Sequence, residues 1–287
     1  DGLHGLTVTQ TDAAGNESPS SSFVLNVDTK APSQTTVITD IQDNEGAKQG
    51  KVDNNGYTDD LSPSINGTIN AALGVNEKVV IYRDGKYLGE ASIDPNDPTV
   101  WHYQDKELEN GKPYQYTARV EDSAGNQGGD SNAYNITIDN DPPPQTISIS
   151  SMTDNVTPIT GDFASGVTTD DSTPQLNGSL SQALAANEYI VIYRDGVQIN
   201  TVTVTAGSTT WSYTDGGLNN NTSYTYTAKI EDGSGLQSAA SNEFKLTFKN
   251  DGSTNTGTIT GVYDDVDPFV GNILNNGYTN DTTPQIG

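Results

Sequence analysis

The sequence predicts an all-β protein made of tandem antiparallel β-sandwiches that form an elongated rod. Three observations support this fold class. Similar segments return in the same order after about 110 residues. Short runs rich in β-branched and aromatic residues alternate with clusters of Gly, Asn, Asp and Pro. No segment keeps an apolar period of 3.6 residues over three turns, so helices are not expected.

The repeat is defined by motifs that keep their spacing. Residues 81–85 (IYRDG) return at 192–196, an offset of 111. The Trp-x-Tyr motif at Trp101 returns at Trp211, an offset of 110. Because these and other matches occur in one fixed order, chance is excluded. They define two complete repeats, residues 33–142 and 143–252.

Partial copies flank the complete repeats. Residues 12–16 (DAAGN) match 122–126 (DSAGN), so residues 1–32 are expected to be the C-terminal part of a preceding repeat. Likewise NDTTP near the end of the chain matches 170–174 (DDSTP), so residues 253–287 are expected to open a following repeat. We therefore expect the chain to be a segment of a longer array.

Local sequence predicts the strands and turns within each repeat. Residues 78–82, 114–120 and 135–138 are rich in β-branched and aromatic side chains, as strands are. Asp-Gly pairs at 84–85 and 195–196 stand between apolar runs, which is the signal of a two-residue hairpin turn.

A tyrosine motif indicates which type of β-sandwich the repeats form. Tyr114 and Tyr224 each follow a Leu by six residues, the spacing of a corner where the Tyr hydroxyl bonds back to the chain entering strand F. Short strands within roughly 110 residues and this corner indicate an immunoglobulin-like sandwich. The chain contains no Cys, so packing alone must hold each sandwich together.

The charge excludes several classes of partner. There are 38 acidic and 13 basic residues, giving a net charge of −25, which disfavours nucleic acid and anionic membranes. No run of about 18 apolar residues occurs, so we expect no membrane insertion, and the first residues do not have a signal-peptide pattern. Asp accounts for 28 of the 38 acidic residues. Such a chain is either disordered or folds with the help of a cation.

At this point the sequence resembles the bacterial Ig-like repeats of giant adhesins of the SiiE type. The resemblance covers the whole chain and depends on DGLHGLTVTQTDAAGNES, VDTKAP, the openings NNGYTDDLSP and NGYTNDTTP, and YRDGKYLG. It implies a long rod that binds Ca²⁺ at domain junctions, leaves the cell by type I secretion, and lies outside the bacterium or on its surface. The implied partners are adjacent Ig-like repeats, the secretion machinery, and a host receptor or glycan bound by the full-length protein. Residues 233–236 (GSGL) and 249–251 (KND) depart from the pattern.

Recurrent Asp residues in predicted loops and linkers are the candidate Ca²⁺ ligands. Ca²⁺ takes six to eight oxygen ligands, mostly carboxylates and carbonyls, and the short Asp side chain holds oxygen close to the backbone. No EF-hand motif is present, so each site would be assembled from separate loops. The candidates are Asp12, Asp28, Asp43, Asp59, Asp60, Asp122, Asp139, Asp141, Asp154, Asp170, Asp171, Asp232 and Asp251.

Sandwich topology predicts which candidates meet, because the A–B loop and C-terminus lie at one pole and the F–G loop at the other. One junction is expected to combine Asp43, Asp59, Asp60, Asp139, Asp141 and Asp232. Asp28 is expected to meet Asp122 at the junction before it. Asp154, Asp170 and Asp171 are expected to meet Asp251 at the junction after it.

Two other classes of function compete with this prediction. Catalysis is not expected, because the only histidines, His4 and His102, are not equivalent in the repeat and no hydrolase motif occurs. A carbohydrate-binding, lectin-like module is the alternative, since Trp101 and Trp211 could stack on sugar rings; their position on a strand favours the core instead. A biofilm-matrix repeat protein is a further alternative. The predicted function is a Ca²⁺-rigidified adhesin stalk that presents a host-cell-binding region away from the bacterium.

Overall fold

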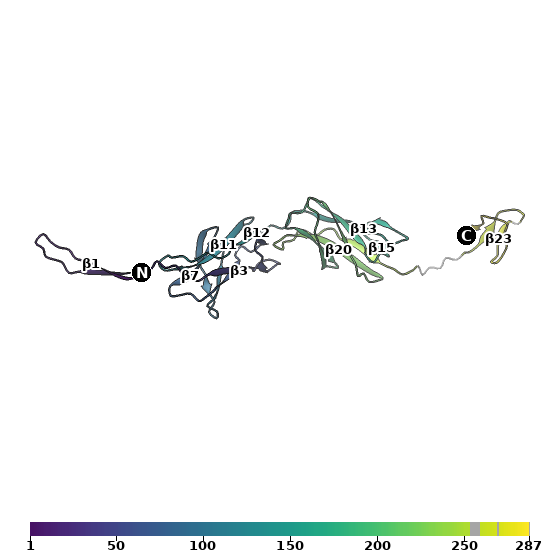
Figure 1. The fold of residues 1–287 in the computed structure, drawn as a ribbon. Helices are drawn as coiled ribbons and strands as arrows, with labels where there is room; N and C mark the ends of the chain where they lie inside the picture. Colours follow the sequence, from purple (N-terminus) through teal and green to yellow (C-terminus); the bar gives the residue numbers. More distant parts are fainter. Residues whose placement is uncertain (253–258, 269, 287) are drawn as a thin grey trace.

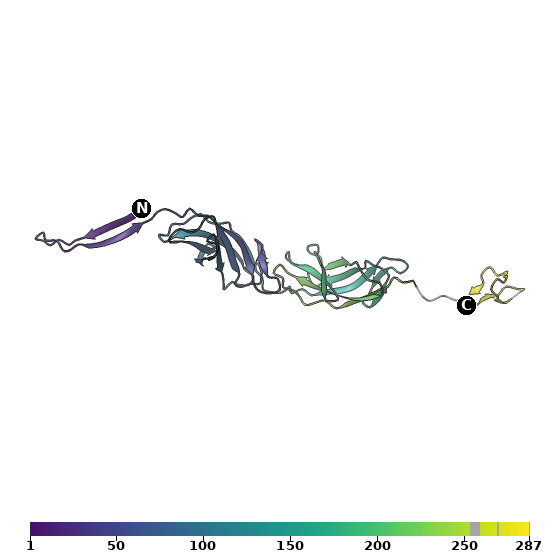
Figure 2. The ribbon, with the colours of Figure 1, turned by 90° about the horizontal axis from the view of Figure 1, so that it is seen from below.

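The computed structural model describes residues 1–252, 259–268 and 270–286. They form strands, turns and loops, and the two complete sandwiches follow one another end to end (Figure 1). A view turned by 90° shows the same elongated arrangement (Figure 2). The predicted fold class, tandem immunoglobulin-like sandwiches in a rod, is confirmed. Within the described residues, no helix is long and apolar enough to cross a membrane.

The first sandwich consists of two five-stranded sheets. One has the order β4 (Gly50–Val52), β3 (Thr36–Asp43), β6 (Ser64–Ile69), β10 (Val100–Gln104) and β9 (Ser92–Ile93). The other has the order β5 (Gly56–Thr58), β12 (Tyr134–Ile138), β11 (Pro113–Asp122), β7 (Glu77–Arg83) and β8 (Lys86–Glu90). All neighbours are antiparallel except β5, which runs parallel to β12.

The second sandwich repeats this plan with one strand fewer. Its first sheet has the order β14 (Gly161–Phe163), β13 (Ile147–Asp154), β16 (Gln175–Leu180) and β19 (Thr210–Thr214). Its second sheet has the order β15 (Val167–Thr169), β21 (Phe244–Phe248), β20 (Thr222–Glu231), β17 (Tyr189–Arg194) and β18 (Val197–Val202). Here too the short strand β15 runs parallel to β21.

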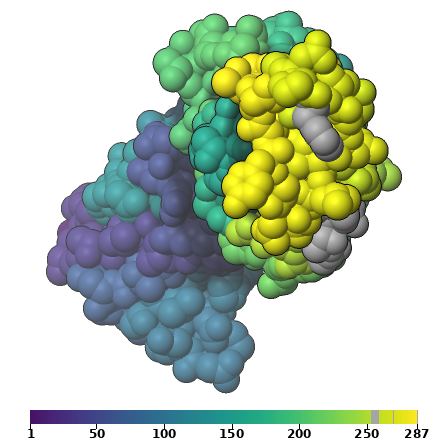
Figure 3. All heavy atoms as spheres, turned by 90° about the vertical axis from the view of Figure 1, so that its right-hand side faces the viewer, coloured from purple at the N-terminus to yellow at the C-terminus, as the bar shows by residue number. Residues whose placement is uncertain are grey.

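Smaller sheets flank the sandwiches. Strands β1 (Gly2–Val8) and β2 (Ser21–Val27) form an antiparallel hairpin. Strands β22 (Val262–Asp264), β23 (Gly271–Ile273) and β24 (Gln285–Ile286) form a three-stranded sheet. Seen from the C-terminal side, the first sandwich lies displaced to one side of the second (Figure 3). The successive units therefore do not share one straight axis.

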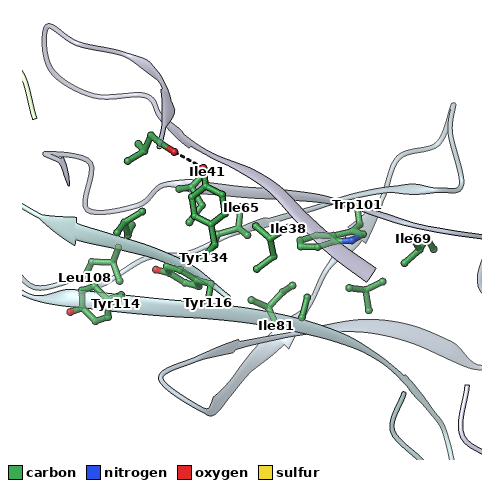
Figure 4. Close-up of a cluster of buried hydrophobic side chains, with 14 of the residues drawn as sticks. Ile38, Ile41, Ile65, Ile69, Ile81, Trp101, Leu108, Tyr114, Tyr116 and Tyr134 are labelled. Carbon is green, nitrogen blue, oxygen red and sulfur yellow. Dashed lines mark hydrogen bonds between the residues drawn. The ribbon is translucent and has the colours of Figure 1, made fainter. Parts of the chain in front are cut away.

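Each core is built by strands that alternate buried and exposed residues. In β12 the burial alternates over all five residues, as expected for a strand with one face on the core. The core of the first sandwich brings together Ile41, Ile65 and Tyr134 from both sheets (Figure 4). Tyr134 Oη donates to the Val52 carbonyl at 2.7 Å, which satisfies its hydroxyl inside the core.

The predicted corner and hairpins are present. The backbone amide of Glu109 donates to Tyr114 Oη at 2.9 Å, and that of Asn219 donates to Tyr224 Oη at 2.7 Å. The β7–β8 turn places Asp84 at φ 51° and Gly85 at φ 75°, the left-handed pair that this turn requires. These local predictions are therefore confirmed in both sandwiches.

Candidate functional site

The junction between the two sandwiches gathers acidic residues from several loops. The loop after β3 and the segment after β5 reach it from the first sandwich, and the linker crosses it. The β20–β21 loop reaches it from the second sandwich. A hollow of about 260 Å³ places the linker residue Asn140 beside Asp59 and Asp60 of the first sandwich. The predicted pole is thus the one at which these segments meet.

One threonine bonds two of the candidate acids at this pole, the first through its carboxylate and the second through its backbone amide. Thr58 Oγ1 donates to Asp43 Oδ2 at 2.6 Å and accepts the Asp60 amide at 3.1 Å. Asp43 Oδ1 accepts the Glu45 amide at 2.9 Å. Asp60 accepts the amides of Asn44 and Ser62 on its two oxygens, at 2.9 and 2.7 Å. The three residues Asp43, Thr58 and Asp60, which we call the Asp–Thr–Asp lock, hold the pole in shape.

The Asp–Thr–Asp lock recurs at each equivalent pole. In the second sandwich, Thr169 Oγ1 donates to Asp154 at 2.6 Å and accepts the Asp171 amide at 3.0 Å. In the sheet of β22–β24, Thr279 does the same with Asp264 and Asp281. Most oxygens of these Asp residues already accept hydrogen bonds. The recurrence of Asp at these positions is therefore explained by loop architecture, independent of any metal.

Asp59 differs from the neighbouring acids of the Asp–Thr–Asp lock. It is buried, and its Oδ1 has no hydrogen-bond partner among the described residues. Its other oxygen lies against Gly46, where a Cβ would be 2.1 Å from Asp59 Oδ2. Burial and the adjacent charges of Asp43 and Asp60 raise the pKa of Asp59. An oxygen left unpaired beside other carboxylates is the feature that a cation would satisfy.

The second unpaired oxygen comes from the next sandwich. Asp232 is buried, and its Oδ1 accepts the amides of Ser234 and Leu236 at 2.9 and 3.0 Å. Its Oδ2 has no partner in the described part of the chain. In the preceding repeat, the equivalent oxygen of Asp122 accepts Asn126 Nδ2 at 2.8 Å. Leu236 replaces that Asn. The change of sequence at residues 233–236 therefore leaves Asp232 Oδ2 without a partner among the described residues.

The linker contributes two carboxylates in different surroundings. Burial and the charge of Asp232 raise the pKa of Asp139, which also accepts Asn187 Nδ2 of the second sandwich at 3.5 Å. Asp141 instead accepts Asn110 Nδ2 at 2.8 Å, at the E–F corner of the first sandwich. Asp251 is held in the same way, by Asn220 and Asn221 at 2.6 and 2.5 Å. Asp251 is thus bound to the corner of its own sandwich.

The remaining candidates lie in the upstream loops and in the second sandwich. Asp12 and Asp122 each accept the amide and side chain of the Asn four residues later. Asn126 Nδ2 also donates to the Asp28 carbonyl at 3.1 Å, so Asp28 and Asp122 share one partner. Asp170 is half-buried.

A metal site is not fully formed by side chains alone. In residues 1–252, 259–268 and 270–286, no group of three or more His, Cys, Asp or Glu side chains is arranged to hold one metal ion. Ca²⁺ also accepts backbone carbonyls and water as ligands, and the unpaired oxygens of Asp59 and Asp232 suit a hard cation. In the described residues, these two oxygens are the features at this junction that a cation could use, together with carbonyls and water.

A buried hydrogen-bond network, which is not among the predicted loop acids, also recurs in both sandwiches. Asp105 is buried in the first sandwich, and both its oxygens accept Arg83 Nη1, at 2.9 and 3.0 Å. Tyr116 Oη donates to it at 2.6 Å, and burial and this bond raise the pKa of Tyr116. Asp215 makes similar contacts with Arg194 and Tyr226. The signal was an acid two residues after each Trp-x-Tyr motif.

Both tryptophans belong to the core. Trp101 is 0% exposed and its Nε1 donates to Thr36 Oγ1 at 2.9 Å, while Trp211 is 5% exposed. Each ring lies on a glycine of the neighbouring strand, Gly67 or Gly178. The core interpretation is confirmed. Stacking on a sugar is closed to the fully buried Trp101, whereas Trp211 lines a hollow of about 510 Å³ beside Gly178 and Ser212.

Similarity to known proteins agrees with the fold. Residues 34–140 match the family described as Bacterial Ig-like domain, which confirms that resemblance for the first sandwich. The chain is also 29% identical over 248 residues to Exoglucanase B of Cellulomonas fimi. That similarity covers 86% of this chain and 20% of the enzyme, so it does not extend to the activity of the whole enzyme.

Among solved structures, similarity is distant. The FN1–FN3 domains of chicken CNTN1 share 12% identity, with 84% of this chain and 76% of that chain covered and a TM-score of 0.37. A structure described as a Ca²⁺-stabilized adhesin that helps an Antarctic bacterium bind ice shares 17% identity. It covers 87% of this chain and 56% of that chain at a TM-score of 0.33. Neither similarity assigns a function to this chain.

Proposed function

We propose that this chain is a stalk segment of a bacterial surface or secreted adhesin, rigidified by Ca²⁺ at its domain junctions. One observation carries the proposal: the junction between tandem sandwiches contains two buried carboxylate oxygens without a partner in the described residues, on Asp59 and Asp232. They come from different sandwiches, so cations bound at these oxygens would lie on both sides of the junction. The work of such a segment is mechanical.

Electrostatics favours a cation at this junction. Two carboxylates about 4 Å apart repel by about 4 kcal/mol at an effective dielectric constant near 20. Asp59 on one side of the junction, and Asp139 with Asp232 on the other, would each contribute carboxylate ligands, with carbonyl oxygens and water completing the coordination. The ion supplies positive charge that offsets this repulsion. In its absence the same carboxylates push the two sandwiches apart.

Mass action determines how much Ca²⁺ stabilises the bound form of the junction. A dissociation constant of ~10⁻⁴ M and free Ca²⁺ at ~10⁻³ M stabilise the bound form by about 1.4 kcal/mol for each site. Calcium is scarce inside cells and abundant outside, so the rod would stiffen after export. Type I secretion and a host receptor or glycan bound elsewhere in the parent protein are parts of this proposal.

A second kind of parent protein fits the same spacer role. The similarity to Exoglucanase B extends over 248 residues, most of this chain. A rigid spacer would separate the modules of a large enzyme as well as it would lift a binding region from a cell. In both cases the function of this segment is to hold other parts at a distance.

Small-angle scattering of the full chain in Ca²⁺ and in EGTA tests the proposal, together with isothermal titration of Ca²⁺. We expect millimolar Ca²⁺ to lengthen the maximum dimension and reduce flexibility, and the titration to show binding. A double variant, Asp59→Asn with Asp232→Asn, should lose both effects. Asp97→Asn, an exposed loop acid, is the matched control. No binding at low millimolar Ca²⁺ and an unchanged scattering profile would refute calcium-dependent rigidity.

A further inference from the structure

We propose that Lys48 and Tyr57 form a docking surface for the β20–β21 loop of the next sandwich, and that Gly233 determines which loops it accepts. We call this contact the glycine dock. It works without metal, so it is separate from the calcium proposal. Its partner is the F–G loop of another Ig-like repeat with Gly at the position after the loop Asp. The glycine dock would decide which repeats can be rigid neighbours.

The contacts come from both sides of the junction. Lys48 Nζ, in the loop between β3 and β4, donates to the Gly233 carbonyl at 2.7 Å. The Tyr57 side chain, in β5, packs directly on Gly233. The alkyl stem of Lys48 lies against Gly235, where a Cβ would be 2.5 Å from Lys48 Cβ. The glycine dock thus consists of one hydrogen bond and of packing on two glycines; Asn187 of the second sandwich also donates to the linker residue Asp139, at 3.5 Å.

Gly233 leaves no room for a side chain. A Cβ there would lie 2.8 Å from Tyr57 Cδ2, 3.2 Å from its Cγ and 3.3 Å from its Cβ. Rotation of the ring could move Cδ2 away, but Cβ and Cγ are fixed close to strand β5. Any larger residue at position 233 must therefore push the loop away from Tyr57 and stretch the bond from Lys48.

The repeats differ at the positions that make this contact. Ser123 and Ala13 occupy the place of Gly233 in the two earlier F–G loops. Thr168 replaces Tyr57, and the exposed Ile159 replaces Lys48, in the second sandwich. At the junction between the two complete sandwiches, Tyr57 of the first sandwich faces Gly233 of the second. The second sandwich lacks both residues of the dock, whereas Tyr278 occupies the place of Tyr57 in the following partial repeat.

The glycine dock does not depend on carboxylates. Its hydrogen bond runs from an ammonium group to a carbonyl, and its packing involves Tyr57 and two glycines. Chelation of Ca²⁺ removes none of these groups. The ammonium of Lys48 also brings a permanent positive charge to a pole that is rich in Asp, at the groove lined by Asp43 and Gly233.

Distance measurement between spin labels tests the glycine dock. The chain has no Cys, so Lys86→Cys and Gln198→Cys introduce one label at an exposed position of each sandwich without background. In EGTA we expect the otherwise unchanged chain to give a narrower distance distribution than the variants that break the glycine dock. Gly233→Ser, which copies the residue of the preceding repeat, should broaden and shift it. Gly129→Ser is the control, because that glycine is exposed, with nothing within 4 Å of its Cβ position.

Two further variants test the hydrogen bond of Lys48 and the packing of Tyr57 separately. Lys48→Met keeps the stem and loses the hydrogen bond, so it should also broaden the distribution. Tyr57→Thr, which copies the second sandwich, should narrow the distribution again when combined with Gly233→Ser. If Gly233→Ser and Lys48→Met both leave the distribution in EGTA unchanged, the glycine dock is overturned. The calcium proposal is judged separately, by whether Ca²⁺ changes the unsubstituted chain.

Discussion

Asp105 shows how much a single buried carboxylate can contribute. It accepts hydrogen bonds from Arg83, Tyr116 and the Lys106 amide, so its charge is fully compensated inside the sandwich. Burial opposes the charge on Arg83, yet the Asp105 carboxylate raises the pKa of that guanidinium. Arg83 also lies over the Tyr114 ring, 5.2 Å from its centroid, which joins this network to the tyrosine corner.

Removing the charge of Asp105 should therefore destabilise the first sandwich strongly. Asp105→Asn leaves the Arg83 guanidinium without its counter-charge and is expected to cost about 3–5 kcal/mol. Urea unfolding of the full chain, followed by Trp fluorescence, measures the loss. Asp130→Asn is the control, because Asp130 is exposed and its pairing with Arg119 at 3.5 Å is worth only about 0–1 kcal/mol. Equal effects of the two substitutions would contradict the proposed role.

The Asp–Thr–Asp lock leads to a second prediction at this scale. Thr58→Val removes the hydroxyl that serves both the Asp43 carboxylate and the Asp60 amide, and all three residues are buried. Each buried group left unpaired is expected to cost about 1–3 kcal/mol. Thermal unfolding checks this, and Thr58→Ser, which keeps the hydroxyl, should retain most of the stability. A Ser variant as unstable as the Val variant would mean that methyl packing matters instead.

At the scale of elements, glycine controls how closely a strand can approach the core tryptophan. A Cβ on Gly67 in β6 would lie 2.1 Å from Trp101 Cζ2 and 2.3 Å from the Val37 carbonyl oxygen. The carbonyl belongs to strand β3, which pairs with β6, so it cannot move independently of the sheet. Gly178 in β16 faces Trp211 and the Ser148 carbonyl in the same way. Both sandwiches thus use one packing rule.

Gly67→Ala should therefore destabilise the first sandwich by about 3 kcal/mol, at the upper end of typical overpacking effects. Gly129→Ala, where nothing lies within 4 Å of the added Cβ, should leave stability nearly unchanged. The two midpoints in urea provide the comparison. Similar midpoints for the two variants would show that the Trp101 ring relaxes at little cost.

Sequence reasoning predicted elements where the signal was local. Strand β7 includes the predicted residues 78–82, and the Tyr corner and Asp-Gly turns appear as expected. The parallel pairing of β5 with β12 was not predicted, because it joins short segments about eighty residues apart without a local signature. Recurrence also identified the Asp positions but could not show which of them cap loops. Asp43 and Asp60 bond nearby amides and Thr58, and that depends on loop geometry.

At the scale of the whole molecule, the hydrogen bonds made by the carboxylates account for how a chain with a net charge of −25 can fold. Many carboxylates are neutralised locally, as in the Asp105 network and the Asp–Thr–Asp locks. Others accept amides in turns, as Asp12 and Asp122 do. At the junction, Asp59 and Asp232 each keep one buried oxygen without a partner among the described residues, and burial raises the pKa of Asp139. We therefore expect the rigidity of the rod to depend on this junction, through contacts between the sandwiches and through the proposed cation.

This distribution predicts that one substitution has opposite effects with and without calcium. In EGTA, Asp59→Asn removes a charge next to Asp43 and Asp60, so the melting midpoint of the first sandwich should rise. In millimolar Ca²⁺ the same variant lacks a ligand for the ion. Its melting midpoint should then be lower than that of the unsubstituted chain, because about 1.4 kcal/mol of binding stabilisation is lost. The amide that the substitution introduces is present in both buffers, so its own hydrogen bonding cancels in the comparison. Calorimetry on both proteins in both buffers measures the crossover, and Asp97→Asn should shift equally in the two. A change of the same sign and size in both buffers would mean that the Asp59 carboxylate does not bind the ion.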